Sequence, residues 1–112
     1  MKGDRLYLLH ILDCLARIQE YTQRGEADFF EDRMRQDAVV RNLQTMAEST
    51  QRLSAALKSA YAEVDWQGIA DFRNVLVHDY LGLNLMLIWK IIRDQVPELK
   101  RAISRILEHT PA

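Results

Sequence analysis

The sequence predicts an all-α fold, a single antiparallel bundle of about five helices that spans residues 1–112. Helix-breaking residues are scarce, with 4 Gly and 2 Pro in the chain. The 15 Leu and 11 Ala, which favour helices, outnumber the 6 Val, 8 Ile and 4 Thr. A hydrophobic content of 48% and a charged content of 28% are typical of a globular domain and exclude a disordered chain.

Apolar residues at helical spacing define the first two helices. Asp4 is expected to cap the first helix, and Gly25 to end it in the left-handed conformation after about 20 residues. Asp28, with Glu31 three residues later, predicts a second start, followed by a long helix to about Tyr61 that can be broken. The apolar stripe of the first helix comprises Leu8, Ile11, Leu12, Leu15 and Ile18.

A third helix is predicted from Trp66 to about Tyr80. Asp65 precedes it as a cap, and Gly82 is expected to end it. Trp66 is interpreted as an anchor in the core or in a subunit contact, with base stacking as a minor alternative.

Two further helices are predicted in the remaining segment. Asn84 starts a helix that is apolar almost all round, which favours a central position or a subunit contact. Trp89 in this helix is interpreted in the same way as Trp66. Pro97 suits the first turn of a last helix through Leu107.

The charge balance and the cysteine content limit the possible functions. The 15 Lys+Arg and 16 Asp+Glu give a net charge of -1, so nucleic-acid chemistry would depend on a few basic groups in a cleft, completed by a second subunit. The single cysteine, Cys14, cannot form an internal disulfide and suits a reducing compartment. No apolar tract is long enough for a membrane span and no signal-like block precedes the domain, so a cytoplasmic protein without membrane contact is expected.

Three histidines are the candidates for acid–base chemistry near neutral pH. His10 and Cys14 lie at i and i+4, a spacing that can hold a metal, but two ligands are not a site. A partly buried histidine beside a small cysteine is the favoured interpretation, and neither a metal nor another cofactor is expected. His109 lies in the predicted last turn, where a cation suits the helix dipole, and is assigned no function.

The remaining histidine, His78, lies in the string Arg73-Asn74-Val75-Leu76-Val77-His78-Asp79-Tyr80. An arginine followed four to six residues later by a histidine is expected about once by chance in such a chain. A tyrosine two positions after the histidine, at fixed spacing, lowers the expectation to about 0.01. The string precedes a predicted helix end, where polar side chains can reach solvent.

This segment resembles the HepT-like branch of the HEPN superfamily. The likeness includes the preceding Trp66–Phe72 segment, the later Gly82, Trp89 and Pro97 pattern and the upstream Asp37–Leu43 segment, and it covers the chain from about Asp4 to Leu107. Members are small all-helical homodimers that act as metal-independent, RNA-cleaving toxins and are encoded beside a minimal nucleotidyltransferase antitoxin.

The resemblance implies a role for four residues. Arg73 and His78 match the catalytic pair, Asn74 matches an assisting polar position, and Tyr80 matches the tyrosine that the antitoxin adenylylates. Asp79 departs from the pattern, because many relatives have a small residue such as glycine there, and it adds a carboxylate beside the site.

The chemistry of these residue types agrees with that assignment. RNA cleavage without a metal requires proton transfer from the 2′-hydroxyl and to the 5′-oxygen, which His78 can perform, and charge stabilisation, which Arg73 can supply. Five residues turn the two side chains about 140° apart on an ideal helix, which favours a composite site between two protomers. The expected products are a 2′,3′-cyclic phosphate and a 5′-hydroxyl, with DNA left intact. Tyr80 lies within about 20° of Arg73 on a continuing helix, so an adenylyl phosphate there would compete with RNA for the guanidinium.

Other interpretations remain open from the sequence. Arg73 can form an ion pair with Asp71, Asp79 or a neighbouring helix, His78 can complement the helix dipole, and Tyr80 can pack its ring at a helix end. At the level of the whole protein, the alternatives are a non-catalytic helical subunit that binds a nucleotidyltransferase and presents nucleotide or substrate to it, and a plain helical dimerisation domain.

Overall fold

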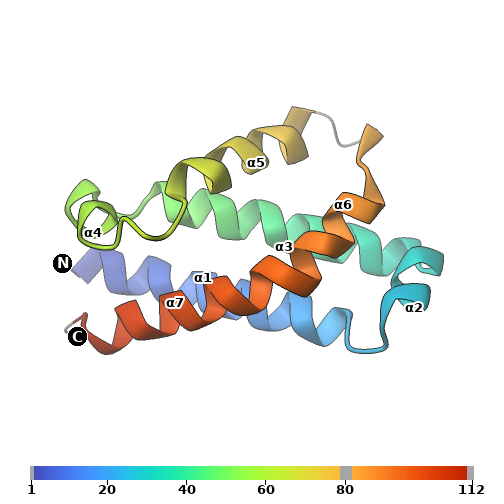
Figure 1. Ribbon diagram of the computed structural model, residues 1–112, viewed down its shortest axis with the longest axis horizontal. Coiled ribbons are helices and arrows are strands. Elements are labelled where there is room, and N and C mark those ends of the chain that lie inside the picture. Colours follow the sequence, from blue (N-terminus) through green and yellow to red (C-terminus); the bar gives the residue numbers. More distant parts are fainter. Residues whose placement is uncertain (1, 79–81, 111–112) are drawn as a thin grey trace.

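Two long antiparallel helices, α1 (Lys2–Tyr21) and α3 (Arg33–Gln51), form the centre of the structure (Figure 1). The computed structural model describes residues 2–78 and 82–110, which contain helices and no strand. Helix α7 (Val96–Glu108) lies along α1, and α5 (Trp66–His78) lies on α3. The prediction of an all-α antiparallel bundle is confirmed.

Shorter helical segments connect the long helices. They are α2 (Glu26–Glu31), α4 (Ala55–Ala60), α6 (Leu85–Lys90) and the π-helical segment η2 (Ile91–Gln95). The chain measures 42 × 27 × 20 Å along its principal axes. Within the described part of the chain, no helix is long and apolar enough to cross a membrane.

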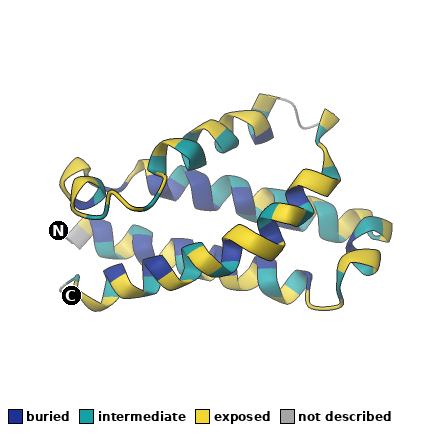
Figure 2. Ribbon diagram, viewed as in Figure 1, coloured by how far each residue is buried: buried dark blue, intermediate teal, exposed yellow. Residues whose placement is uncertain are grey.

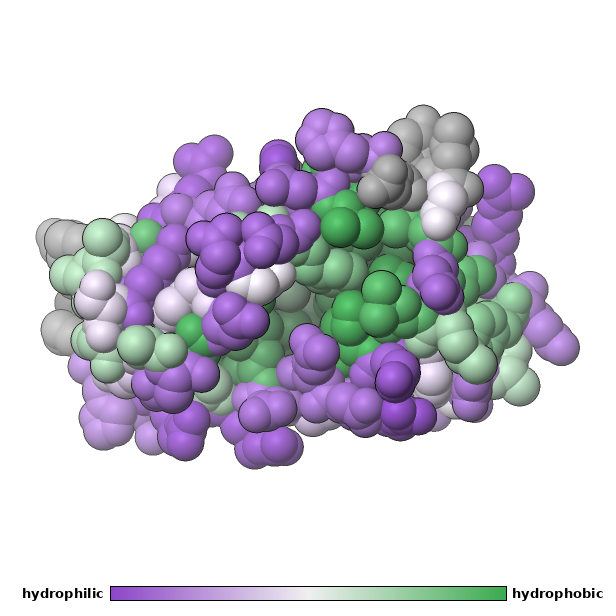
Figure 3. Space-filling view, turned by 45° about the horizontal axis from the view of Figure 1, so that its top comes forward, coloured by the Kyte–Doolittle hydropathy of each residue, from purple (hydrophilic) through white to green (hydrophobic). Residues whose placement is uncertain are grey.

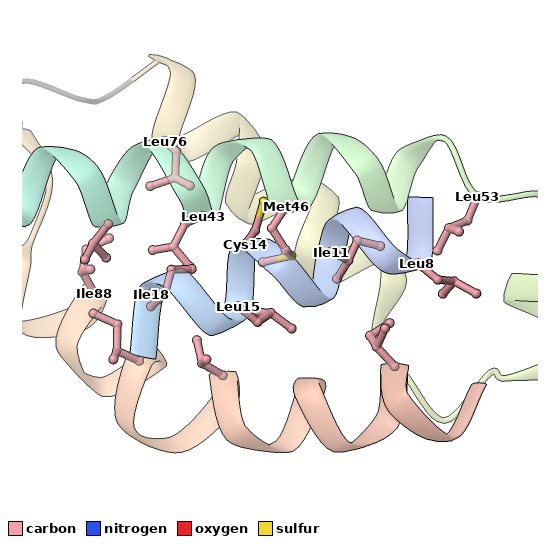
Figure 4. Close-up of a cluster of buried hydrophobic side chains, with 14 of the residues drawn as sticks. Leu8, Ile11, Cys14, Leu15, Ile18, Leu43, Met46, Leu53, Leu76 and Ile88 are labelled. Carbon is pink, nitrogen blue, oxygen red and sulfur yellow. The ribbon is translucent and has the colours of Figure 1, made fainter. Parts of the chain in front are cut away.

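The core forms where the apolar stripe of α1 meets α3 and α7. Leu8, Ile11, Leu15 and Ile18 are completely buried, as their spacing predicts, and Leu12 packs partly buried at the edge. Leu43 of α3 projects into the same cluster (Figure 4). The inward faces of the long helices are buried and the outward faces are exposed (Figure 2), so the apolar spacing alone determines which side of each helix faces inward.

Asp4 does not cap the first helix, because α1 already begins at Lys2. Its carboxylate is buried and accepts two hydrogen bonds from Ser54, one from the backbone N–H at 2.8 Å and one from the hydroxyl at 2.7 Å. The Ser54 hydroxyl oxygen in turn accepts from the Leu57 N–H and caps α4. Asp4 therefore joins the start of α1 to the start of α4, a contact between residues 50 positions apart.

The predicted second helix is broken at Asp32. Asp32 has an extended backbone conformation and caps α3 by accepting from the Arg35 N–H, whereas the expected start at Asp28 lies inside α2. The Arg35 guanidinium contacts the carboxylates of Asp28 at 3.0 Å and Asp32 at 3.1 Å, which holds the corner between α2 and α3. Gly25 has the expected positive φ, 100°, but it precedes α2 and does not terminate α1.

The predicted fourth and last helices form one continuous rod. Asn84 caps α6 as expected, accepting from the Met86 N–H at 3.0 Å. Pro97 lies in the first turn of α7, but no break separates α6 from α7, because η2 joins them through a bond from the Val96 N–H to the Ile91 carbonyl. The wider π turns let the chain continue past a proline that would disrupt a regular α-helix.

Helix α6 has one buried side and one exposed apolar side. Ile88 is buried, and Trp89 packs its ring 5.5 Å from that of Phe29. Met86 and Leu87 are 59% and 49% exposed, so the central position expected for this helix applies to one face only. Figure 3 shows apolar side chains gathered on this side of the molecule.

We expect the substitution Asp4→Ala to lower the free energy of unfolding by about 2 kcal/mol, because it removes two hydrogen bonds to a buried carboxylate and leaves the Ser54 N–H unsatisfied. The exposed Asp37 of α3 supplies the control, and Asp37→Ala should change the value by less than about 0.5 kcal/mol. Urea unfolding followed by circular dichroism measures both. Equal stability of the two variants would contradict the role assigned to Asp4.

Candidate active site

Helix α5 carries the predicted site residues and is fixed at both its start and its middle. Asp65 caps it as expected, accepting from the Gly68 N–H at 2.9 Å. The indole N–H of Trp66 donates to the Tyr61 carbonyl at 3.1 Å, and the ring packs partly buried against the core. Leu76 is buried against α3 (Figure 4). These contacts determine which residues of α5 face α3 and which face solvent.

Arg73 faces α3 and forms an ion pair with it. Its Nη2 lies 3.2 Å from Oε2 of Glu48, and its Nη1 donates to Oδ1 of Asn74 at 3.4 Å. The side chain is 29% exposed, and the Nε atom is buried with no hydrogen-bond partner among the described residues. Of the ion pairs that the sequence left open, the one with a neighbouring helix is present, and Glu48 is the partner.

Asn74 lies beside Arg73 on the exposed side of α5. Its amide oxygen accepts the bond from the Arg73 guanidinium, which gives it a geometric means of orienting that group. Asn74 therefore contacts Arg73, one of the two residues of the predicted catalytic pair.

His78 is the last residue of α5 and is exposed. Within residues 2–78 and 82–110, its ring has no hydrogen bond or ion pair. Among the described residues no hydrogen bond joins His78 to Arg73, whose partners are Glu48 and Asn74. Tyr80 and Asp79 lie outside the described residues.

An open groove of about 770 Å³ lies next to Arg73. Helices α1, α3 and α5 each contribute to its walls. The lining residues are Leu6, Tyr7, His10, Thr45, Glu48, Ser49, Gln51, Arg52 and Arg73. The groove therefore surrounds the Arg73–Glu48 ion pair with polar and aromatic side chains.

His10 and Cys14 are neighbours, as their spacing predicts. The His10 Nε2 lies 3.8 Å from the Cys14 sulfur, and its Nδ1 lies 2.6 Å from the Ser49 hydroxyl. Cys14 is buried and His10 is exposed, so the expectation of a partly buried histidine is wrong. Burial raises the pKa of the Cys14 thiol, which stays protonated near neutral pH. The described residues contain no group of three or more potential metal ligands around this pair.

The sequence analysis missed Glu48, His10 and Arg52 as neighbours of Arg73. Their only signal is a polar spacing on α1 and α3, which is indistinguishable from an ordinary solvated helix face. Packing of α1, α3 and α5 is what brings these residues to one groove.

The fold and the groove define a small all-helical protein with an arginine in an open groove between three helices. Residues 11–106 match the sequence model of the family described as Ribonuclease HepT-like. The chain belongs to this family, as its resemblance to the HepT-like branch suggested.

Named relatives agree with this family. A Methanocaldococcus jannaschii protein, "Gamma-glutamylcyclotransferase and putative RNase", is 34% identical over 96% of this chain and 49% of its own length, so the chain spans about half of that relative. A "Putative RNase" of Caldanaerobacter subterraneus is 34% identical over 96% of this chain and 97% of its own length. A "Probable ribonuclease HepT" of Thermococcus cleftensis is 29% identical over 94% and 96% of the two chains. No solved structure matches the chain.

A double-mutant cycle with Arg73→Ala and Glu48→Ala should give a coupling energy of about 1 kcal/mol, because the two side chains are only 29% and 35% exposed. The matched control is Arg17 with Asp13, whose side chains are 55% and 56% exposed and should couple by less than about 0.5 kcal/mol. Urea unfolding of the single and double variants measures both. A coupling no larger than that of the control pair would show that Glu48 does not fix Arg73.

Proposed function

We propose that this chain is a metal-independent endoribonuclease toxin of a toxin–antitoxin pair. It cleaves RNA at a composite site between two protomers, and a minimal nucleotidyltransferase antitoxin silences it by adenylylating Tyr80. The observation that carries the proposal is Arg73, which lines an open groove in a chain that belongs to the ribonuclease HepT-like family. The names of the relatives support RNA as the substrate class.

The cleavage step follows from the two side chains. One His78 accepts the proton of the RNA 2′-hydroxyl as its oxygen attacks the adjacent phosphorus. The bond from phosphorus to the 5′-oxygen breaks, and the second protomer's protonated histidine donates the proton that the leaving oxygen needs. Arg73 donates to the phosphoryl oxygens, where negative charge develops, and Asn74 orients the guanidinium.

A homodimer supplies the second histidine that the cleavage step needs. Val75 lies three residues before His78, hence on a similar side of α5, and is 42% exposed. Together with the exposed Met86 and Leu87 of α6, it gives an apolar surface suited to a second copy of this chain. Contact through this surface would place two copies of His78 near the two-fold axis.

Adenylylation of Tyr80 gives a means of control. Seven residues separate Arg73 from Tyr80, so a helix that continues past His78 would place both on nearly the same face. The phosphate of an adenylyl group would then pair with Arg73 in place of RNA and fill the cleft.

The ion pair to Glu48 also favours a second candidate, a non-catalytic helical subunit that binds the nucleotidyltransferase. In that case the charge of Arg73 is satisfied within the protein and serves the fold. The cleavage experiment below distinguishes the two functions.

Purified protein should cleave RNA in the presence of EDTA, leave DNA intact and release 2′,3′-cyclic phosphate ends. His78→Ala should lower the rate by at least about 100-fold, the usual contribution of a general acid or base. His109→Ala, which removes another exposed histidine at the end of α7, should retain the rate, and both variants should remain dimeric in sedimentation. RNA that stays intact while the partner still binds would leave the non-catalytic subunit as the function.

Incubation with the partner nucleotidyltransferase and ATP should increase the mass of the chain and abolish RNA cleavage. Tyr80→Phe should prevent both changes while cleavage continues, because the ring stays but the acceptor hydroxyl is lost. Tyr21→Phe, on α1, is the control and should still be modified and silenced. Intact-mass spectrometry with a cleavage assay measures both effects, and modification of the Tyr80→Phe protein would place the acceptor elsewhere.

A further inference from the structure

The groove beside Arg73 contains residues that the proposed cleavage step does not use. Four of them lie on α3 and its C-terminal cap at positions i, i+3, i+4 and i+7 and therefore face the same side of that helix. They are Thr45, Glu48, Ser49 and Arg52. Opposite them, α1 contributes Tyr7 and His10. Polar side chains thus extend from Arg73 along two helices, with the exposed Leu6 beside them.

The charge of this surface suits a phosphate. Glu48 is paired with Arg73, so its carboxylate is already neutralised. Arg52 is exposed, and its guanidinium has no ion pair or hydrogen bond to any other described side chain. In a chain with a net charge of -1, Arg52 gives the groove one positive charge beyond the Arg73–Glu48 pair, and a positive group in a cleft attracts a polyanion.

The two rings on α1 suit a nucleobase. Tyr7 and His10 are three residues apart on the same face of the helix. Ser49 and Cys14 contact the two ring nitrogens of His10, which holds its exposed ring in one orientation. Unstacked RNA bases bind to such rings, and a ring that is already fixed loses little conformational freedom on binding.

We propose that this groove binds a nucleotide of single-stranded RNA next to the scissile phosphate. Arg52 holds the phosphate of that nucleotide, and Tyr7 with His10 contacts its base. The inference rests on the proposed function, because Arg73 belongs both to the groove and to the cleavage site. It adds a subsite that selects extended single-stranded RNA.

The test measures binding of a fluorescent 2′-O-methyl RNA oligonucleotide, which lacks the attacking hydroxyl and is not cut. Anisotropy titrations over a range of salt concentrations give the dissociation constant and its salt dependence. Arg52→Ala should weaken binding and reduce the slope of log K against log salt by about 0.7, the value for one phosphate contact on a single strand. Arg101→Ala, which removes an exposed arginine of α7, should leave the slope unchanged.

A second pair of variants tests the base contact. Tyr7→Leu should weaken binding by about tenfold through loss of a stacking ring, and Tyr7→Phe should bind as the unmodified protein does. Thermal unfolding checks that each variant is folded. If Tyr7→Leu does not fold, the arginine pair alone decides the outcome.

Several results would overturn the proposal. Arg52→Ala and Arg101→Ala could affect binding equally, or Arg52→Ala could change the mass of the assembly in sedimentation, which would assign the groove to a subunit contact. Cleavage by the unmodified protein separates the two proposals. If the protein cuts RNA but Arg52→Ala does not weaken binding, the subsite alone is overturned. If Arg52→Ala weakens binding but the unmodified protein does not cut RNA, the nuclease alone is overturned. Absence of RNA binding overturns both.

Discussion

The packing of α1 against α3 is the interaction on which the rest of the structure depends. Each completely buried Leu or Ile along this contact contributes roughly 1.5–3 kcal/mol, whereas a partly exposed ion pair such as Arg73–Glu48 contributes about 1 kcal/mol or less. The groove is formed by residues next to the buried ones on the same helical turns: Tyr7 and His10 flank Leu8, and Glu48 follows Met46 and Ala47. The candidate site is therefore positioned by the core beneath it and not by its own polar contacts.

Glu48 has two opposite effects on Arg73. It holds the guanidinium at a defined position, and it also reduces the positive charge that a phosphate would meet. An arginine has five N–H donors, and the contacts with Glu48 and Asn74 use one each. Because Nε is buried, one donor on Nη1 and one on Nη2 remain for an anion, so a fixed arginine in this setting combines orientation with free binding capacity. His78 differs from Arg73, because it is exposed at the end of α5 and has no hydrogen bond or ion pair with the described residues.

The sequence predicted the local features of this structure better than the long-range ones. Apolar spacing placed the stripe of α1 correctly, and Asn84 and Asp65 identified the starts of two helices, because these signals act within one or two turns. The bond from Ser54 to Asp4 and the corner held by Arg35 depend on contacts between distant segments, which no local pattern encodes. The same division applies to the site. The spacing from Arg73 to Tyr80 predicted a site on α5. Glu48, His10 and Arg52 come to the same groove as Arg73 only because α1, α3 and α5 pack together.

The π-helical segment η2 determines the rotational phase between α6 and α7. A π turn accommodates one residue more than an α turn, and each residue turns a helix by about 100°. With this extra residue, Ile88 of α6 and Ile103 of α7 both point to the core, while Met86 and Leu87 face outward. Regular α-helical bonding of the same five residues would rotate α6 by about a quarter of a turn relative to α7, because the wide turn would no longer absorb the extra residue. The π turn thus sets the angle at which Ile88 meets the core while Met86 and Leu87 stay exposed.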